Sequence, residues 1–244
     1  MIKMFDLKDK VIIVTGSNRG NGLAISNGLK NARAKVIGID LKFDTQNSDN
    51  YEFDLLNTKL LKDLILDIHK KNGSIDGLVN NAGVSIESSS PYDDKVTYKK
   101  TLDINLNAAF ELSSNVLPIM AENGSGSIVN ITSLGAELGF ANNPSYQISK
   151  AGLRQMTRAL AKDWGSSGIR VNNICPGYIK TSMTQKSFDD PELYEVRRNK
   201  SVLGRWGNSK DLVGPSIFLL SDASSFITGS DIYVDGGWTS NAGI

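Results

Sequence analysis

Short hydrophobic runs alternate along the chain with longer segments in which hydrophobic residues recur every three or four positions. The short runs are rich in β-branched residues, which is typical of buried parallel strands. They predict strands over 10–15, 35–40, 75–80, 126–131, 168–174 and 232–234, with a further strand-like run at 51–55. The longer segments have the period of amphipathic helices. They predict helices over 23–30, 60–68, 95–120, 145–164 and 210–220.

Alternation of strands and helices at this spacing indicates βαβ units, and therefore a parallel sheet covered on both faces. We predict an α/β fold: one domain over 1–244, with a doubly wound, Rossmann-type sheet of about seven strands. Ligands of such sheets bind outside the carboxyl ends of the strands. The chemistry is therefore expected in the loops after Thr15, Asp40, Asn80, Ile131 and Ile174.

Composition excludes several classes of function. The formal net charge of +1 gives no overall attraction for nucleic acid or a membrane surface, so neither is expected as a partner. One cysteine and one histidine exclude an internal disulfide, a Cys-based metal site and any cluster of two imidazoles, and no metal site is predicted. The first residues reach a charge before a signal core could form, and no stretch approaches the ~20 apolar residues of a membrane span. A cytoplasmic protein is expected.

A glycine-rich turn follows the first predicted strand, with the spacing G-x-x-x-G-x-G. Glycines here let the backbone turn sharply and approach a pyrophosphate at the amino terminus of the next helix. A turn without a ligand is the alternative. The residues expected to bind a dinucleotide are Gly16, Asn18, Arg19, Gly20, Asn21 and Gly22.

Asp40 ends the second predicted strand, 18 residues after Gly22. This is close to the ~20-residue offset at which a carboxylate binds the adenosine ribose hydroxyls. A carboxylate there repels a 2′-phosphate and favours NAD. Arg19 has the opposite effect, since its guanidinium could pair with that phosphate. We expect NAD, with NADP possible.

Tyr146 and Lys150 lie four residues apart in a predicted helix and therefore project from one face. An ammonium beside a phenol stabilises the phenolate, which is needed for base catalysis near neutral pH. Ser133 ends a predicted strand 13 residues earlier and could hydrogen-bond a substrate oxygen. An isolated Y-x-x-x-K match, however, occurs by chance in many proteins.

Several motifs occur together in one order, so this match is not isolated. They are Thr15–Gly22, Asp54, Asn80-Asn81-Ala82-Gly83, Asn105, Ser133, Tyr146, Lys150, Pro176-Gly177 and Asp235-Gly236-Gly237. From about residue 8 to 238 the chain resembles the classical short-chain dehydrogenase/reductase family. The resemblance implies that Tyr146 exchanges a proton with an alcohol or ketone. It implies that Ser133 polarises the reacting oxygen, and that Asn105 supports a proton-relay water near Lys150.

The resemblance also implies contacts with the cofactor. Lys150 would lower the pKa of Tyr146 and hold the nicotinamide ribose, so that both residues line the cofactor site. Asn81, Ala82 and Gly83 would line the pocket beside the adenosine, and Asp54 and Leu55 would meet the adenine. After Pro176 and Gly177, the backbone at Ile179 and the hydroxyl of Thr181 would hold the carboxamide. A buried helix-bend residue at Asn105 and a simple cap at Asp54 are the alternatives.

Two positions depart from the family pattern. Asn21 replaces an aliphatic residue, which should not matter if the contact uses backbone N–H groups. Arg33 stands where glycine commonly ends the first helix, so we expect a differently built turn there, because a left-handed non-glycine cap costs ~1 kcal/mol. The resemblance further implies a mobile substrate lid over about 182–205 and a homotetramer, although a dimer is also open.

The leading hypothesis is an NAD-dependent oxidoreductase that moves a hydride between nicotinamide C4 and a secondary alcohol or ketone. A sugar, polyol or sugar acid is favoured, since polar residues are expected near the substrate: Ser85, Glu137, Asn142, Asn143 and Gln147. The alternative is an NADPH-dependent 3-oxoacyl-thioester reductase, which would suit Arg19. A non-catalytic nucleotide-sensing scaffold is disfavoured, because Ser133, Tyr146 and Lys150 are all present.

Overall fold

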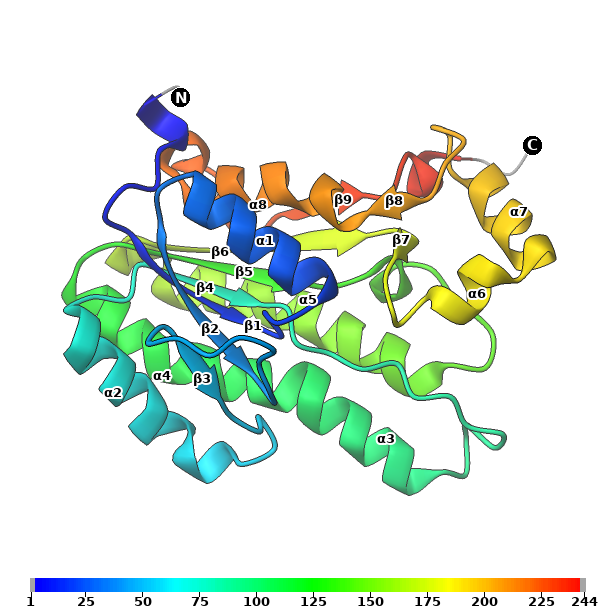
Figure 1. Cartoon of the computed structure of the whole chain (residues 1–244), viewed down its shortest axis with the longest axis horizontal. Helices are drawn as coiled ribbons and strands as arrows, with labels where there is room; N and C mark the ends of the chain where they lie inside the picture. Colours follow the sequence, from blue (N-terminus) through cyan, green and yellow to red (C-terminus); the bar gives the residue numbers. More distant parts are fainter. Residues whose placement is uncertain (1–2, 242–244) are drawn as a thin grey trace.

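A computed structural model describes residues 3–241 of the chain (Figure 1). Residues 1–2 and 242–244, which belong to the predicted span of 1–244, lie outside the described residues. The main sheet has seven parallel strands in the order β3-β2-β1-β4-β5-β6-β9. These strands are β1 (Val11–Thr15), β2 (Lys35–Asp40), β3 (Asn50–Glu52), β4 (Gly77–Asn80), β5 (Gly126–Ile131), β6 (Ile169–Pro176) and β9 (Asp231–Val234). The predicted α/β fold with about seven parallel strands is confirmed.

Helices cover both faces of this sheet (Figure 1). On one face, α2 (Leu61–Asn72), α4 (Ala108–Glu122) and α5 (Pro144–Trp164) pack against the strands through a large apolar cluster. On the other face, α1 (Gly20–Asn31) and α8 (Val213–Leu220) close a second cluster. No helix within residues 3–241 is long and apolar enough to cross a membrane.

The predicted helix over 95–120 is interrupted. It consists of α3 (Lys95–Leu102) and α4, joined by a π-helical turn at Asp103–Asn107. Hydrophobic spacing does not reveal such a turn, because it widens the helix without breaking it. Single π turns occur frequently at functional sites, and this one carries Asn105.

The predicted lid region is more regular than its polar sequence indicates. It contains α6 (Gln185–Asp189) and α7 (Pro191–Lys200). A two-stranded sheet of β7 (Ile179–Lys180) and β8 (Gly207–Asn208) joins the two ends of this region. This segment therefore forms a pair of helices beyond the carboxyl ends of the main strands, at the right of Figure 1.

The turn at Arg33 corrects one sequence-based expectation. Arg33 has φ 74°, so it adopts the left-handed conformation that glycine usually supplies, and the turn is not built differently. Its guanidinium donates from Nε to Asp6 at 2.9 Å and forms an ion pair with the same carboxylate. This charge-assisted pair helps to offset the cost of the left-handed backbone.

Candidate active site

The strand order reverses between β1 and β4, and the loops after these two strands meet there. Gly16 has φ 64° and Gly20 has φ 54°, conformations that side chains disfavour. A Cβ at Gly22 would lie 2.0 Å from the carbonyl oxygen of Gly16, so this turn closes only with glycine. The glycine spacing therefore reflects a sharp, closely packed backbone turn, while the approach to a pyrophosphate stays a prediction.

The amino terminus of α1 has no side-chain cap, since Arg19 occupies the N-cap position without such a hydrogen bond. The first N–H groups of a helix have no partner within the helix and favour an anion. A Cβ at Gly20 would meet only Thr181, at 3.8 Å, so there is space between the turn and Thr181. A dinucleotide pyrophosphate fits these donors and this space, and Asn21 would contribute through its backbone.

The carboxylate of Asp40 lies between the end of β2 and the glycine turn. It accepts hydrogen bonds from the backbone N–H groups of Asn18 at 2.9 Å and Leu41 at 2.8 Å. These bonds fix the carboxylate at the edge of the predicted cofactor site. Arg19 is exposed, whereas Asn18 accepts from Asp44 N at 3.3 Å through its side chain.

Asn81 clips the loop after β4 to the glycine turn. Its Nδ2 donates to the carbonyl oxygens of Thr15 at 2.8 Å and Gly16 at 3.2 Å. The hydroxyl of Thr15 accepts from Asn81 N and Ala82 N, each at 3.0 Å. Sequence reasoning singled out Asn81 but missed Thr15, whose hydroxyl is the other half of this clip.

Asp54 and Leu55 follow β3, at the same edge of the sheet. Asp54 accepts from Leu56 N at 3.0 Å, which is the capping role left open as the alternative. Leu55 is partly buried against the core. The adenine contact of these two residues stays a prediction.

Tyr146 lies in the first turn of α5, and Ser133 lies directly after β5. Burial raises the pKa of the Tyr146 phenol, and the neighbouring Ser133 hydroxyl lowers it to a smaller extent. Ser133 also accepts from Gly135 N at 3.0 Å. The fold thus brings the two side chains together, on elements that are adjacent in space.

Lys150 is buried beneath these hydroxyls, with 4% of its surface exposed. Its Nζ donates to the carbonyl of Ile131 at 2.7 Å and lies 5.8 Å from the centre of the Tyr146 ring. Burial lowers the pKa of Lys150 to about 8. The ammonium contacts a main-chain carbonyl, and the predicted effect of Lys150 on the pKa of Tyr146 stays a prediction.

Asn105 projects from the π turn towards the same place. Its Oδ1 accepts from Val84 N at 2.8 Å, and its Nδ2 donates to Val84 O at 2.9 Å and Ser149 Oγ at 3.0 Å. A Cβ at Gly83 would approach Asn105 Oδ1 at 3.3 Å and Lys150 Nζ at 3.4 Å. The side chain thus holds the loop at 83–84 against α5. The predicted relay water near Lys150 stays a prediction.

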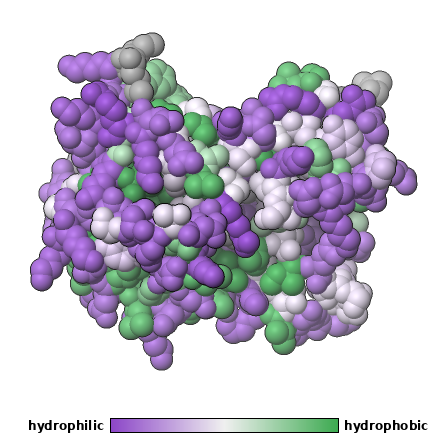
Figure 2. Space-filling model, in the orientation of Figure 1, coloured by the Kyte–Doolittle hydropathy of each residue, from purple (hydrophilic) through white to green (hydrophobic). Residues whose placement is uncertain are grey.

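A cavity of about 470 Å³ opens in front of Tyr146 and Ser133. Figure 2 shows this side of the molecule hollowed between the part that carries α1 and the part that carries α6 and α7. Four of the five predicted polar residues line the cavity: Ser85, Asn142, Asn143 and Gln147. Glu137 does not; its carboxylate forms an ion pair with Arg154 and accepts from Tyr233 OH at 3.1 Å, so this expectation was wrong.

The segment after β6 forms the far wall. Pro176 and Gly177 line the cavity, and a Cβ at Gly177 would lie 2.8 Å from Asp235 Cα. Ile179 is buried in β7, and its carbonyl accepts from Thr184 Oγ1 at 2.6 Å. Thr181 N donates to the same hydroxyl at 3.0 Å. These bonds hold Thr181 opposite the glycine turn.

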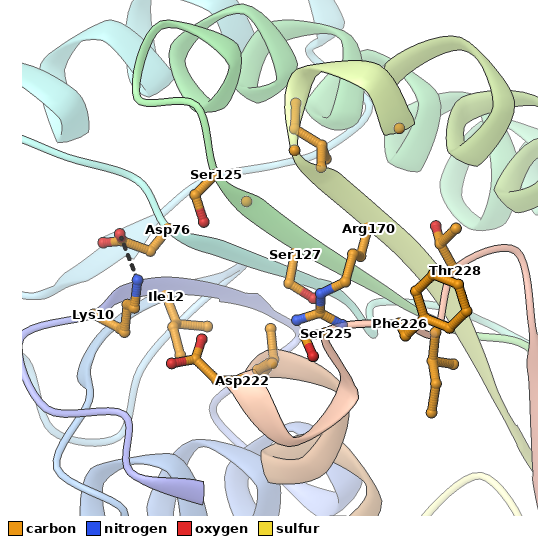
Figure 3. Close-up of a pocket in the computed structure, with 16 residues that line it drawn as sticks. Lys10, Ile12, Asp76, Ser125, Ser127, Arg170, Asp222, Ser225, Phe226 and Thr228 are labelled. Atoms are coloured by element: carbon orange, nitrogen blue, oxygen red, sulfur yellow. Dashed lines mark ion pairs between the residues drawn. The ribbon is translucent and has the colours of Figure 1, made fainter. Parts of the chain in front are cut away.

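A second cavity, of about 450 Å³, lies at the amino ends of the strands (Figure 3). The two cationic side chains of its lining already have partners. Lys10 pairs with Asp76 at 3.6 Å, and Arg170 donates to Ser224 Oγ at 2.6 Å. This edge is opposite to the one where parallel sheets bind ligands, so the candidate site is the cavity beside Tyr146.

Comparisons with known proteins agree with this site. Residues 16–239 match the family model described as enoyl-(acyl carrier protein) reductase, a model of short-chain dehydrogenases/reductases. A 2-dehydro-3-deoxy-D-gluconate 5-dehydrogenase of Pseudoalteromonas atlantica is 35% identical, covering 98% of this chain and 99% of its own. A gluconate 5-dehydrogenase of Gluconobacter oxydans is 32% identical, with 97% of each chain covered.

A solved structure has the same fold. The crystal structure of a gluconate 5-dehydrogenase from Burkholderia cenocepacia, in complex with NADP and tartrate, superposes with a TM-score of 0.91. It is 29% identical, and the match covers 97% of this chain and 98% of that one. The likeness therefore extends over nearly the whole chain.

Proposed function

The chain belongs to the short-chain dehydrogenase/reductase family and is an NAD(P)-dependent oxidoreductase of CH–OH groups; we propose that it oxidises a secondary hydroxyl of a sugar acid. The observation that carries the proposal is the placement of Tyr146 and Ser133 next to each other at the wall of the cavity. Two hydroxyls held together in this way can receive one substrate oxygen.

The proposed chemistry assigns one role to each side chain. Bound nicotinamide would accept the hydride at C4. Ser133 would hold the substrate hydroxyl, and Tyr146 would take its proton as the general base. Lys150 would supply a buried positive charge behind the phenol. Asn105 would keep the loop at 83–84 in position beside Lys150.

The substrate class rests on the cavity and on the relatives. Polar groups of Ser85, Asn142 and Asn143 lie at its wall, where they suit a polyhydroxylated molecule better than an acyl chain. The two curated relatives act on sugar acids by name, and the Burkholderia structure holds tartrate, a hydroxy acid. We place gluconate and 2-dehydro-3-deoxy-D-gluconate first among the substrates to test.

For the cofactor we propose a preference for NAD over NADP. The Asp40 carboxylate is fixed by two backbone N–H groups and cannot easily turn away. A 2′-phosphate beside it would meet a like charge, whereas ribose hydroxyls would donate to it. The exposed Arg19 is the group that would favour NADP, and it is the reason to test both cofactors.

We further propose a lid, an oligomeric state and a cellular location for the protein. The segment at 182–205 would serve as the lid of a single domain. Val96, Phe110 and Ile148 expose apolar side chains on α3, α4 and α5, which supports helix pairing in a homotetramer, testable by light scattering. A cytoplasmic location would give access to NAD(H) and keep Cys175 reduced; cell fractionation tests it.

The experiment is an absorbance assay at 340 nm with purified protein. One arm offers NAD⁺ or NADP⁺ with gluconate, 2-dehydro-3-deoxy-D-gluconate and polyols. The other offers NADPH, the cofactor that would suit Arg19, with a 3-oxoacyl thioester, the substrate class named for a 31% identical relative from Thermotoga maritima. We expect NADH in the first arm only. Consumption of NADPH in the second arm alone would overturn the proposed substrate class and cofactor.

A further inference from the structure

Arg197 of α7 is partly buried, and one of its guanidinium nitrogens has no acceptor. Its guanidinium carbon lies 4.4 Å from the centre of the Tyr178 ring and 5.9 Å from that of Trp206. Its Nη1 is buried and has no hydrogen-bond partner among the described residues. A guanidinium is always charged and presents five N–H donors, so an unpaired buried donor is costly. The position is suited to an acceptor that comes from outside the chain.

Three of the four other cations of the lid have an acidic partner, and the fourth, Lys200, is exposed. Lys186 pairs with Glu87, Arg198 with Glu195 and Arg205 with Asp211, each at 2.8 Å. Arg198 is the direct neighbour of Arg197 on the same helix. The free Nη1 of Arg197 is therefore a specific feature and not a general property of this basic segment.

Arg197 lies at the wall of the proposed substrate cavity. It lines the same cavity as Tyr146 and Ser133. Among the described residues of that lining, Glu87 is the only other charged one, and Lys186 already holds its carboxylate. An acidic molecule that entered the cavity would meet one uncompensated positive charge.

Arg197 also borders a cavity of about 500 Å³ behind the lid. The two acidic side chains that line this cavity already have partners. Asp211 pairs with Arg205, and Asp235 accepts from Gly237 N at 2.9 Å and Thr239 N at 2.8 Å. Neither carboxylate bonds to Arg197, so this second cavity does not supply the missing acceptor.

Aromatic packing holds Arg197 in place. The ring of Tyr194 stacks on Trp206 at 5.9 Å, and Trp206 Nε1 donates to Tyr194 O at 3.1 Å. Phe188 of α6 packs edge-on against both rings, at 5.1 Å and 5.2 Å. With Tyr178 beneath the guanidinium, the face of the cation is covered while its edge keeps N–H donors for a carboxylate.

We propose that Arg197 binds the carboxylate of the substrate and so selects a sugar acid over the corresponding uncharged polyol. This inference rests on the proposed function. The reacting hydroxyl would lie at Tyr146 and Ser133, and the carboxylate would lie at the lid. A carboxylate bound to α7 would also tie the lid to the substrate, which links recognition of the acid to closure.

The test compares D-gluconate with D-glucitol, which carries CH₂OH in place of the carboxylate. Arg197→Gln should lower kcat/KM for gluconate on the order of 100-fold, mainly through KM, and change that for glucitol by less than about threefold. Arg197→Lys should recover part of the loss, since it restores charge without the planar fork. Arg198→Gln, on the same helix, is the matched control and should change neither value by more than about twofold.

A second readout does not depend on turnover. Gluconate should raise the melting temperature of the wild-type complex with NADH more than glucitol does, and Arg197→Gln should abolish that difference. An equal loss for both substrates, or an acid-specific shift that persists in Arg197→Gln, would overturn the role of Arg197. If the wild-type protein binds the acid through Arg197 but forms no NADH from any sugar acid, the proposed function fails instead.

Discussion

Lys150 donates to the carbonyl of Ile131 at 2.7 Å, which places its ammonium at the carboxyl end of β5 and behind the Tyr146 ring. The bond spans the end of one strand and the second turn of the helix that carries both residues of the Y-x-x-x-K motif. Burial at this place lowers the pKa of Lys150 to about 8. The charge that the proposed chemistry requires is therefore held at a cost to folding.

That cost predicts a pH-dependent effect of Lys150→Met on stability. Below pH 8 the lysine is charged in both states, and folding carries the full desolvation penalty. A fall in pKa from 10.5 to about 8 corresponds to ~3 kcal/mol. Since the unfolded chain binds more protons between these values, wild-type stability rises with pH there. Urea unfolding at pH 7 should thus show the variant as the more stable, with the gap closing towards pH 10.

The exposed Lys162 lies on the same helix and provides the control. Lys162→Met should show no such dependence. A gap between Lys150→Met and wild type that stayed constant from pH 7 to pH 10 would mean that burial does not perturb Lys150 as described.

Asn105→Ala should destabilise the protein by about 2–4 kcal/mol, because it leaves both backbone groups of Val84 and the hydroxyl of Ser149 without this partner. Asn107→Ala is the matched change in the same π turn. Asn107 is exposed and bonds only to Asp103, at 2.9 Å, so about 0.5 kcal/mol is expected. Denaturant unfolding measures both. Equal effects would show that the bonds of Asn105 do not hold the loop.

Asp40→Ala should change cofactor preference. Removal of the carboxylate takes away the acceptor for the ribose hydroxyls and the repulsion of a 2′-phosphate. The ratio of the NADH to the NADPH dissociation constant should rise about tenfold or more. Arg19→Ala should shift this ratio in the opposite direction. Fluorescence titration with both nucleotides decides: an unchanged ratio in Asp40→Ala would refute the assignment.

Gly22→Ala tests the glycine turn. The new Cβ would collide with the Gly16 carbonyl, so the turn must open and the pyrophosphate donors must move. NADH affinity should fall by at least about tenfold. A Cβ at Gly214 in α8 would meet nothing within 4 Å, so Gly214→Ala should bind NADH normally. Normal binding by Gly22→Ala would place the nucleotide elsewhere.

Local periodicity was sufficient for the sheet and for the Tyr146–Lys150 pair, since both depend on spacing within one element or between successive elements. It could not reveal the π turn at Asn105, whose geometry depends on bonds to Val84 and Ser149. Local periodicity also could not predict the left-handed backbone of Arg33, because Asp6, 27 residues away, supports that turn. No motif or spacing in the sequence around Arg197 marks it as a binding residue. Only its packing distinguishes Arg197, whose Nη1 is buried without a partner, from the paired Arg198.

In the proposed reaction, Tyr146 takes the proton of the substrate hydroxyl. The most direct test is the rate of NADH formation from NAD⁺ and the sugar acid by Tyr146→Phe, with NADH affinity measured on the same samples. We expect the rate to fall by about 10³-fold or more while the dissociation constant of NADH changes by less than about threefold. Turnover within tenfold of wild type by a folded, nucleotide-binding Tyr146→Phe protein would contradict it.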